Sequence, residues 1–177
     1  ARAQVGFGSS DYNSYTRGNL ELFLYDGTFA PYIGVENGGA FHDREFCASC
    51  NGVINSEYDY NAAVLGLQIK PFENRRVDPY LVVGVLHGRV KYSAKAKDTR
   101  DSVVSLSRDQ ASYTAYRGGL GLHIALRRKL ALEVELNATN GVPAAYAVVS
   151  NGTSTANVDM FNRSTIVNIA FGVRYYF

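Results

Sequence analysis

The sequence of 177 residues has no tryptophan, one methionine, two cysteines and four prolines. It also lacks a run of the roughly 20 consecutive apolar residues that a membrane-spanning helix needs, and this absence excludes a helical membrane protein. The net charge is only +2, so no strong overall field indicates a nucleic-acid partner. The opening stretch "ARAQVGFG" has no apolar core typical of a signal peptide, although a processed, exported chain would look the same. The length predicts one domain over residues 1–177.

The stretch "STIVNIAFGVRYYF", residues 164–177, alternates between two kinds of side chain. Every second residue is large and apolar: Val167, Ile169, Phe171, Val173, Tyr175 and Phe177. The interleaved residues are mostly small or polar and include Arg174. Such a period of two predicts a β-strand whose two faces meet different solvents. The apolar solvent is either a protein core or a lipid bilayer.

Alternation of this kind recurs along the chain, and no window has a convincing helical stripe. The strand candidates lie at about 2–9, 18–26, 29–42, 58–70, 79–93, 111–126, 129–139 and 161–177. The sequence therefore predicts an all-β protein of eight strands.

The links between these candidates alternate strictly in length. Short links contain "DGT", "PFENRRV" and "RRK", while longer, polar links cover about 10–17, 43–57, 94–110 and 140–160. With antiparallel strands, all long links fall at one end, which is typical of outer-membrane barrels with short periplasmic turns. Most candidates have on the order of ten residues, as a tilted membrane crossing needs, whereas soluble strands typically have about 5–6. We predict an eight-stranded antiparallel up-and-down transmembrane β-barrel with four long external loops and three short periplasmic turns.

A soluble eight-stranded ligand carrier of the lipocalin type is the rival fold. Such a carrier needs an apolar interior. In this chain the more polar face, which carries the charges, is the one expected to point inward. Its usual Gly-x-Trp start is also impossible, because the chain has no tryptophan. The apolar face of residues 167–177 is therefore expected to contact lipid.

Three stretches resemble a known family. The C-terminal strand ends in Phe177, and the runs "APYIGVENG" and "DPYLVVGVLHG" look like Pro-Tyr strand starts. The chain thus resembles the small bacterial outer-membrane barrels that include the OmpA membrane domain, OmpX and NspA. The resemblance implies a location in the Gram-negative outer membrane, export by a signal peptide absent from this chain, and recognition of the C-terminal strand by the barrel-assembly machinery. Members of this family include adhesins, serum-resistance factors, membrane anchors, narrow porin-like channels and a few lipid-A enzymes.

Alternation also predicts which polar side chains face the lumen. The proposed charge network consists of Glu21, Glu36, Arg117, His123, Glu133, Glu135 and Arg174, and further inward residues are Arg2, Gln4, Phe23, Tyr25, Gln68, Asn137 and Asn168. Because eight strands leave an interior that side chains just fill, buried charges there must pair. We interpret the network as a salt-bridged plug, and a narrow, gated ion path through it is the alternative. The register of 79–93 stays ambiguous, since His87, Arg89 and Lys91 face either the lumen or the upper membrane interface.

The only cysteines, Cys47 and Cys50, stand in "FCASCNG" within a long link. In an oxidising compartment, a disulfide that closes this small loop is the favoured interpretation. A zinc site would need further ligands, and the nearby candidates are His42, Asp43 and Glu45. A redox pair usually opens a helix that lowers the thiolate pKa, and this Gly- and Asn-rich context does not favour one. The sequence indicates no cofactor.

Groups suited to catalysis are sparse. The histidines are His42, His87 and His123, and the sequence has no His-x-Ser pair of the kind seen in lipid-A deacylases. His123 has Glu133 and Glu135 on the next strand but no evident nucleophile beside it, so we interpret it as a hydrogen-bonding residue of the lumen. We therefore expect no enzyme, and a lipid-A-modifying enzyme is the second alternative function.

The external loops carry the remaining signals. The third loop holds the cations Lys91, Lys95, Lys97, Arg100 and Arg108, which either contact lipopolysaccharide phosphates or form a solvated, mixed-charge loop. The apolar "AAYAVV" of the last loop indicates either a contact surface or a segment folded over the barrel mouth. Our leading hypothesis is an outer-membrane barrel whose loops act in adhesion, in host or lipopolysaccharide contact, or in membrane integrity. A narrow ion or small-solute channel is the first alternative.

Overall fold

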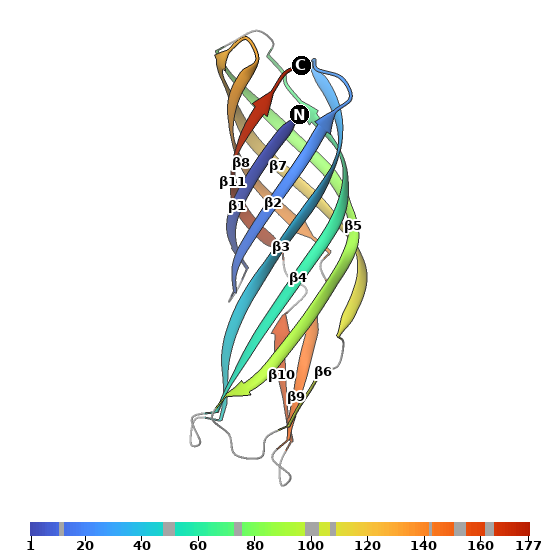
Figure 1. Cartoon of the computed structure of the whole chain (residues 1–177), viewed down its shortest axis with the longest axis vertical. Coiled ribbons are helices and arrows are strands. Elements are labelled where there is room, and N and C mark those ends of the chain that lie inside the picture. Colours follow the sequence, from blue (N-terminus) through green and yellow to red (C-terminus); the bar gives the residue numbers. More distant parts are fainter. Residues whose placement is uncertain are drawn as a thin grey trace.

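Eight antiparallel strands close into a barrel (Figure 1). The barrel strands are β1 (Arg2–Ser10), β2 (Asn13–Phe23), β3 (Phe29–Cys47), β4 (Gly52–Ile69), β5 (Val77–Lys97), β7 (Gln110–Arg127), β8 (Leu130–Asn140) and β11 (Ile166–Tyr175). They follow the order β1-β11-β8-β7-β5-β4-β3-β2, so that β1 and β11 close the wall. This architecture confirms the predicted fold.

The structure is a computed structural model that describes residues 1–10, 13–47, 52–72, 76–97, 103–106, 109–141, 143–150, 155–161 and 165–177. All regular elements within these ranges are strands. The described residues include no helix that is long and apolar enough to cross a membrane.

The two ends of the barrel differ. The short-turn end has the short links 24–28, 70–76 and 128–129 together with both termini (Figure 1). At the opposite, protruding end, β3, β4 and β5 continue beyond the last pair of β2 with β3, Ser14 with Phe41. The stretch 43–57, expected to be a loop, is thus largely strand, because β3 and β4 stay paired as far as Cys47.

A three-stranded sheet at the protruding end forms from segments that were expected to be loops (Figure 1). It consists of β6 (Val103–Leu106), β9 (Ala145–Ser150) and β10 (Thr155–Phe161), in the order β10-β9-β6. β9 contains most of the apolar stretch "AAYAVV", and its Ala145, Ala147 and Val149 are buried together with residues of the barrel wall. This packing favours the interpretation that the segment folds over the barrel mouth.

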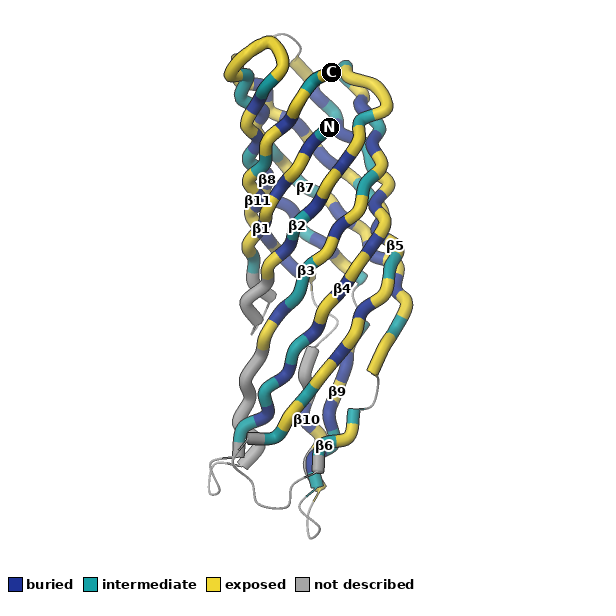
Figure 2. Tube along the Cα trace, in the orientation of Figure 1, coloured by how far each residue is buried: buried dark blue, intermediate teal, exposed yellow. Residues whose placement is uncertain are grey.

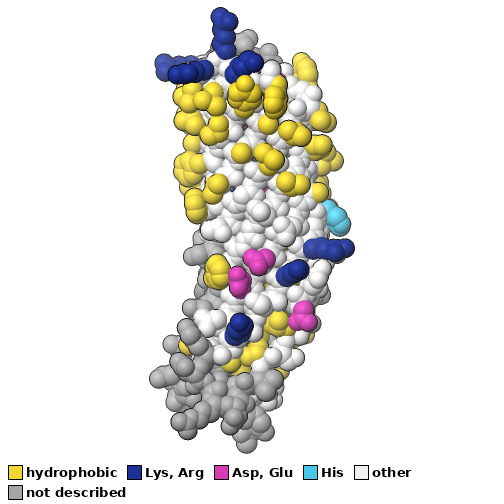
Figure 3. Space-filling model, viewed as in Figure 1, with side chains coloured by type: hydrophobic (Ala, Val, Ile, Leu, Met, Phe, Trp, Pro, Cys, Tyr) yellow, Lys and Arg dark blue, Asp and Glu magenta, His cyan; other side chains and the backbone are white. Residues whose placement is uncertain are grey.

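Burial alternates along the barrel strands (Figure 2). The outward apolar side chains form a belt on the short-turn half (Figure 3), which includes Val5, Phe7, Leu20, Leu22, Ile33, Val35, Leu65, Leu81, Val83, Leu120, Leu122, Leu132, Leu136, Val167, Ile169, Phe171 and Val173. The seven predicted network residues are each at most 5% exposed. Both observations agree with the predicted faces, and they place an apolar solvent outside the barrel.

In β5, whose register was ambiguous, the side chains of His87, Arg89 and Lys91 face away from the lumen. His87, Arg89 and Lys91 are exposed, while Leu86 and Val90 point inward and are buried. Both faces of β5 carry apolar residues, so the sequence of this strand shows no clear alternation.

One facing prediction is wrong. Tyr25, expected in the lumen, is 65% exposed. The reason is that β2 ends at Phe23, so the alternation of the strand no longer applies two residues later.

Candidate functional site

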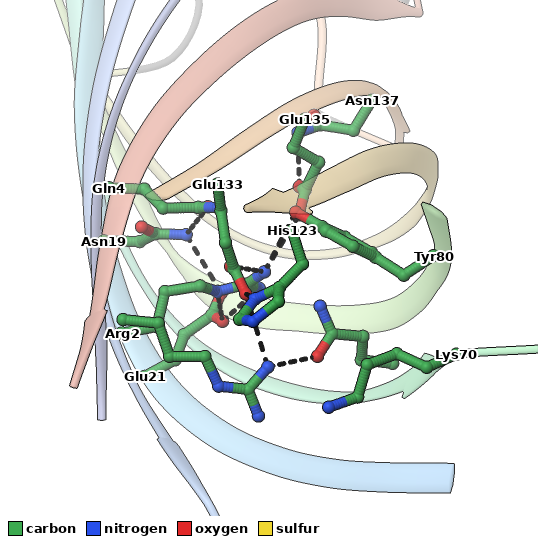
Figure 4. Close-up of polar contacts among 12 residues, drawn as sticks. Arg2, Gln4, Asn19, Glu21, Lys70, Tyr80, His123, Glu133, Glu135 and Asn137 are labelled. Atoms are coloured by element: carbon green, nitrogen blue, oxygen red, sulfur yellow. Dashed lines mark hydrogen bonds and ion pairs between the residues drawn. The ribbon is translucent and has the colours of Figure 1, made fainter. Parts of the chain in front are cut away.

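Arg2 lies at the centre of a charge network inside the barrel (Figure 4). Its guanidinium pairs with the carboxylate of Glu21. Its Nη1 lies 3.0 Å from Glu133 Oε2 and 3.1 Å from Glu135 Oε2. The side chains of all four residues are at most 1% exposed. Because each charge has given up its hydration, the pairing itself keeps this arrangement tolerable.

A second cluster lies nearer the protruding end. Arg117 Nη2 is 2.6 Å from Glu36 Oε1, and Arg17 Nη1 is 3.2 Å from Glu36 Oε2. The hydroxyl of Tyr60 donates to Glu36 Oε1 at 2.7 Å. Arg17 Nη2 also lies 3.6 Å from Glu135 Oε1, and this contact joins the second cluster to the network around Arg2.

The short-turn mouth of the lumen holds a third group of charges. Arg174 Nη1 donates to Gln68 Oε1 at 2.6 Å and lies 3.3 Å from Glu133 Oε1. Arg174 Nη2 lies 3.1 Å from Asp26 Oδ1, and Lys70 Nζ lies 2.5 Å from the same oxygen. One carboxylate, that of Asp26, therefore contacts two cations at the rim.

His123 is hydrogen-bonded through both ring nitrogens. Its Nδ1 lies 3.0 Å from Glu133 Oε1, and its Nε2 lies 3.0 Å from the hydroxyl of Tyr176. A carboxylate only accepts, so Nδ1 donates to Glu133, and Nε2 is the ring nitrogen that pairs with the hydroxyl of Tyr176. Tyr176 lies just beyond β11, and burial raises its pKa to about 12, so the phenol stays a donor at neutral pH. These contacts give His123 the hydrogen-bonding environment expected from the sequence.

Two tyrosines occupy space that glycines leave open. Tyr32 lies opposite Gly66, and Tyr80 lies opposite Gly121. A Cβ built on either glycine would clash with the facing ring. The rings therefore lie against the neighbouring strands, and the hydroxyl of Tyr80 reaches Glu135 Oε2 as a donor at 3.2 Å.

The structure brings together every network residue predicted from the sequence: Glu21, Glu36, Arg117, His123, Glu133, Glu135 and Arg174. It adds four charges that the predicted network omitted, namely Arg2, Arg17, Asp26 and Lys70. Arg17 was missed because it fell within a predicted loop. The signal was present, since a period of two continued backward from Glu21 through Asn19 reaches it.

Several buried polar atoms in this lumen have no hydrogen-bond partner within the described residues. They include Gln4 Nε2, Arg17 Nε, Asn19 Oδ1, Gln68 Nε2, Asn137 Oδ1 and both side-chain amide atoms of Asn168. Buried polar groups are usually satisfied by protein or water, so these atoms mark the most hydrophilic part of the lumen.

The protruding half of the lumen is filled by apolar and aromatic side chains. Its buried cluster includes Ile54, Tyr58, Tyr60, Tyr92, Tyr113, Ala145, Ala147, Val149 and Val158. The ring centroid of Tyr58 lies 6.3 Å from those of Tyr60 and Tyr92. The hydroxyl of Tyr92 donates to the carbonyl of Pro143 at 2.6 Å, which ties the wall to the segment before β9. The three-stranded sheet thus completes a core that the barrel strands begin.

A recess of about 830 Å³ lies on the outer wall where the apolar belt gives way to polar residues. Its lining includes Thr16, Gly18, Asn37, Gly39, Asp59, Asn61, Gly88, Arg89, Lys91 and Gln110, from β2, β3, β4, β5 and β7. In the strand register, Arg89 lies opposite Asn61 and Lys91 lies opposite Asp59. Two cations, the carboxylate of Asp59, amides and small residues therefore meet at one height on the outer surface.

Some predicted contact residues fall outside the described part of the chain. Lys91 and Lys95 are exposed on β5, and Lys97 is its last residue. Arg100 and Arg108 lie outside the described residues.

The predicted disulfide between Cys47 and Cys50 finds no support. Cys47 is the last residue of β3, but its side chain and the whole of Cys50 lie outside the described residues. The side chain of His42, the nearest zinc ligand considered, is not described either. The metal and redox alternatives for this stretch therefore stay predictions.

A scan against protein-family models finds no match, and a search of curated proteins by sequence finds none either. Solved structures do match. A major outer membrane protein from Thermus thermophilus has a TM-score of 0.63 at 13% identity, and the match covers 99% of both chains. OprG from Pseudomonas aeruginosa has a TM-score of 0.64 at 13% identity, covering 99% of this chain and 95% of OprG. The fold is that of the small outer-membrane barrels. Neisserial surface protein A, a member of the family named above, matches with a TM-score of 0.59 at 10% identity, covering 99% of this chain and 94% of that protein.

The expectation that the chain is not an enzyme must be corrected. The outer membrane enzyme PagL matches with a TM-score of 0.51 at 13% identity, and the match covers 99% of this chain and 100% of PagL. A barrel of this size therefore supports catalysis as well as other roles, and the fold leaves the question of an enzymatic activity open.

Proposed function

We propose that the protein resides in the bacterial outer membrane and acts through its protruding end, where the recess on the outer wall binds the phosphate and sugar headgroup of lipopolysaccharide. The observation that carries this proposal is the position of Arg89 and Lys91, exposed side by side on β5 just beyond the apolar belt. Recognition of the C-terminal strand by the barrel-assembly machinery stays a prediction, as does contact with a host or protein ligand.

The chemistry of the recess supports a sugar-phosphate ligand. Guanidinium and ammonium groups form charge-assisted hydrogen bonds with phosphate. Asn37 and Asn61 each offer an amide donor and acceptor for hydroxyl groups, and they lie opposite each other on β3 and β4. Arg89 faces the neutral Asn61 across the strand pair, so its charge remains available to a ligand.

The test compares R89A/K91A with the conservative variant R89K/K91R and measures binding of purified lipopolysaccharide to the refolded barrel. We expect the alanine variant to bind at least roughly tenfold more weakly, because two phosphate contacts are lost. The conservative variant keeps both charges and should retain most of the binding at low salt, and high salt should weaken it because exposed charges are screened. Equal binding by the parent and the alanine variant would refute the proposal.

A narrow channel is the second candidate function. It is favoured by buried polar atoms of Gln4, Asn19, Asn137 and Asn168 that have no hydrogen-bond partner in the described part of the chain and line the lumen between its two clusters of arginines. The test is single-channel conductance of the refolded protein in a planar bilayer, with Arg117→Ala beside the parent. Discrete openings that change with the substitution support the channel. A stably inserted parent without openings counts against it.

A further inference from the structure

The short-turn end carries a cluster of cations that the charge network does not use. Arg76 lies just before β5, and Arg127, Arg128 and Lys129 lie at the turn between β7 and β8. All four residues are exposed. These two places are neighbours because β5 pairs with β7, and Figure 3 shows basic side chains gathered at this end, beyond the apolar belt.

The three arginines of this cluster line a cavity of about 570 Å³ at the mouth of the lumen. Its lining includes Arg76, Arg127, Arg128, Lys70, Asp26, Asp78, Phe72, His123 and Tyr176. The carboxylate of Asp26 already binds Lys70 at 2.5 Å and Arg174 at 3.1 Å. Asp78, the other carboxylate of the lining, also has an interaction partner. Within the described residues, no ion pair occupies Arg76, Arg127 or Arg128, so the cavity has excess positive charge.

The backbone that carries these cations is fixed to the barrel. The amide of Ala125 donates to the carbonyl of Arg76 at 2.9 Å, which holds the backbone of Arg76 against β7. The amide of Tyr176 donates to the carbonyl of Lys129 at 3.0 Å, which holds the turn between β7 and β8 against the end of β11. The guanidinium groups are therefore presented from two anchored segments around one cavity.

The cavity also borders the apolar belt. Phe72 is 46% exposed, Val77 is 47% exposed and Leu126 is 48% exposed, and each is within a few residues of an arginine in the sequence. A ligand that suits both surfaces has an anionic group for the arginines and an apolar chain for the belt. Guanidinium groups match phosphate well, and clustered cations are attracted to an anionic lipid surface.

We propose that the short-turn end binds the phosphate headgroup of an anionic phospholipid, with Arg76, Arg127 and Arg128 as its contacts and the acyl chains along the apolar belt. This site faces the membrane leaflet opposite to the recess on the outer wall. The proposal depends on the fold and on these residues alone, so its failure would leave the lipopolysaccharide proposal unaffected.

The experiment titrates the refolded barrel in neutral micelles with dihexanoylphosphatidylglycerol and follows the backbone amide signals of Phe72, Arg76 and Ala125 by NMR. Parallel titrations use dihexanoylphosphatidylcholine and inorganic phosphate. We expect saturable shifts with the phosphatidylglycerol that are at least roughly tenfold weaker in R76Q/R127Q/R128Q, because three headgroup contacts are lost. The single variant R128Q, at an exposed turn position, keeps the test decisive if the triple variant fails to refold, and should show a smaller loss of affinity.

The matched control is R89Q/K91Q/K95Q, which removes the same number of charges at the protruding end and should leave these shifts unchanged. Equal affinity for phosphatidylglycerol and phosphatidylcholine overturns the proposal, because headgroup charge then plays no part. Inorganic phosphate that binds as tightly as the lipid also overturns it, since the site would then serve a free anion. Equal losses of affinity in the triple variant and its control would also overturn the proposal, because the effect would then come from the overall charge of the protein.

Discussion

In the half of the lumen near the short turns, Arg2 and Arg174 are 1% exposed and are surrounded by carboxylates. In the protruding half, the corresponding space holds the uncharged side chains of Tyr58, Tyr92 and Val149, buried to a similar degree. The same antiparallel wall encloses both. The charged half is built by barrel strands and their turns, whereas the apolar half depends on β9, which lies outside the barrel order.

Because of this difference, substitutions in the two halves are expected to destabilise the protein in different ways. A buried charge that loses its partner cannot regain hydration, so damage to one member of the network destabilises the whole barrel. An apolar core loses stability in proportion to the contacts removed, and a separate sheet above it can open by itself. The predictions below test this contrast, from the largest expected effect to the smallest.

The largest effect is expected for Arg2→Met. The substitution leaves Glu21, Glu133 and Glu135 without their shared cation, and breaking a buried ion pair from one side costs about 3–5 kcal/mol. The measurement is the free energy of unfolding in urea of the barrel refolded into lipid vesicles.

The control for this prediction is Arg89→Met, which removes the same charge from the exposed outer wall. Exposed charges contribute little, so the control should change the free energy of unfolding by less than about 1 kcal/mol. If the two variants are equally stable, the charged half is not held together by its ion pairs.

The charged half also shows how far the sequence alone predicts this molecule. Period-two alternation located all eight barrel strands, because lumen and lipid select opposite side chains on successive residues. It left the facing of β5 open, where Leu86 and Val90 make the inner face as apolar as the outer one. It also failed to include Arg17 in the network, although Glu21 and Asn19 stand in phase with it.

The protruding half was less predictable, for a different reason. Beyond the lipid belt, both faces of a strand can be polar, so alternation no longer marks where β3 and β4 end. β6 pairs with β9 from a distant part of the chain, and Val103 lies opposite Ser150. Such long-range pairing leaves no local signal in the sequence.

The second prediction concerns the tyrosines that border both halves. Gly121→Ala places a Cβ against the ring of Tyr80, which must move away from Glu135, and overpacking of this kind costs about 1–3 kcal/mol. Gly118→Ala is the matched control on the same strand, because no atom of the described residues lies within 4 Å of a Cβ there. Urea unfolding of both variants measures the difference, and equal stability would show that the ring is not confined by the glycine.

The third prediction separates the apolar half from the barrel. Val149→Ala should lower hydrogen-exchange protection of the β9 amides by about 1–2 kcal/mol, because buried methyl groups are lost. Protection of β8 and the overall free energy of unfolding should change by less than about 0.5 kcal/mol, because the sheet opens locally. Val148→Ala, on the other face of β9 and only half-buried, is the control. A uniform loss of protection in both strands would show that the sheet and barrel unfold together.

The smallest effect is expected at the rim, where the charged half meets solvent. Burial raises the pKa of Tyr176 to about 12, above the usual value of about 10, so the folded state favours the neutral phenol that donates to His123. The resulting stabilisation is present below about pH 10 and is lost as the pH rises through about 12, because between these pH values the folded state binds more protons than the unfolded state. The urea midpoint of the parent, compared with that of Tyr176→Phe, should therefore fall between these pH values, since the other tyrosines titrate equally in both proteins. A constant difference between the two urea midpoints across this pH range would mean that folding does not raise the pKa of the Tyr176 hydroxyl.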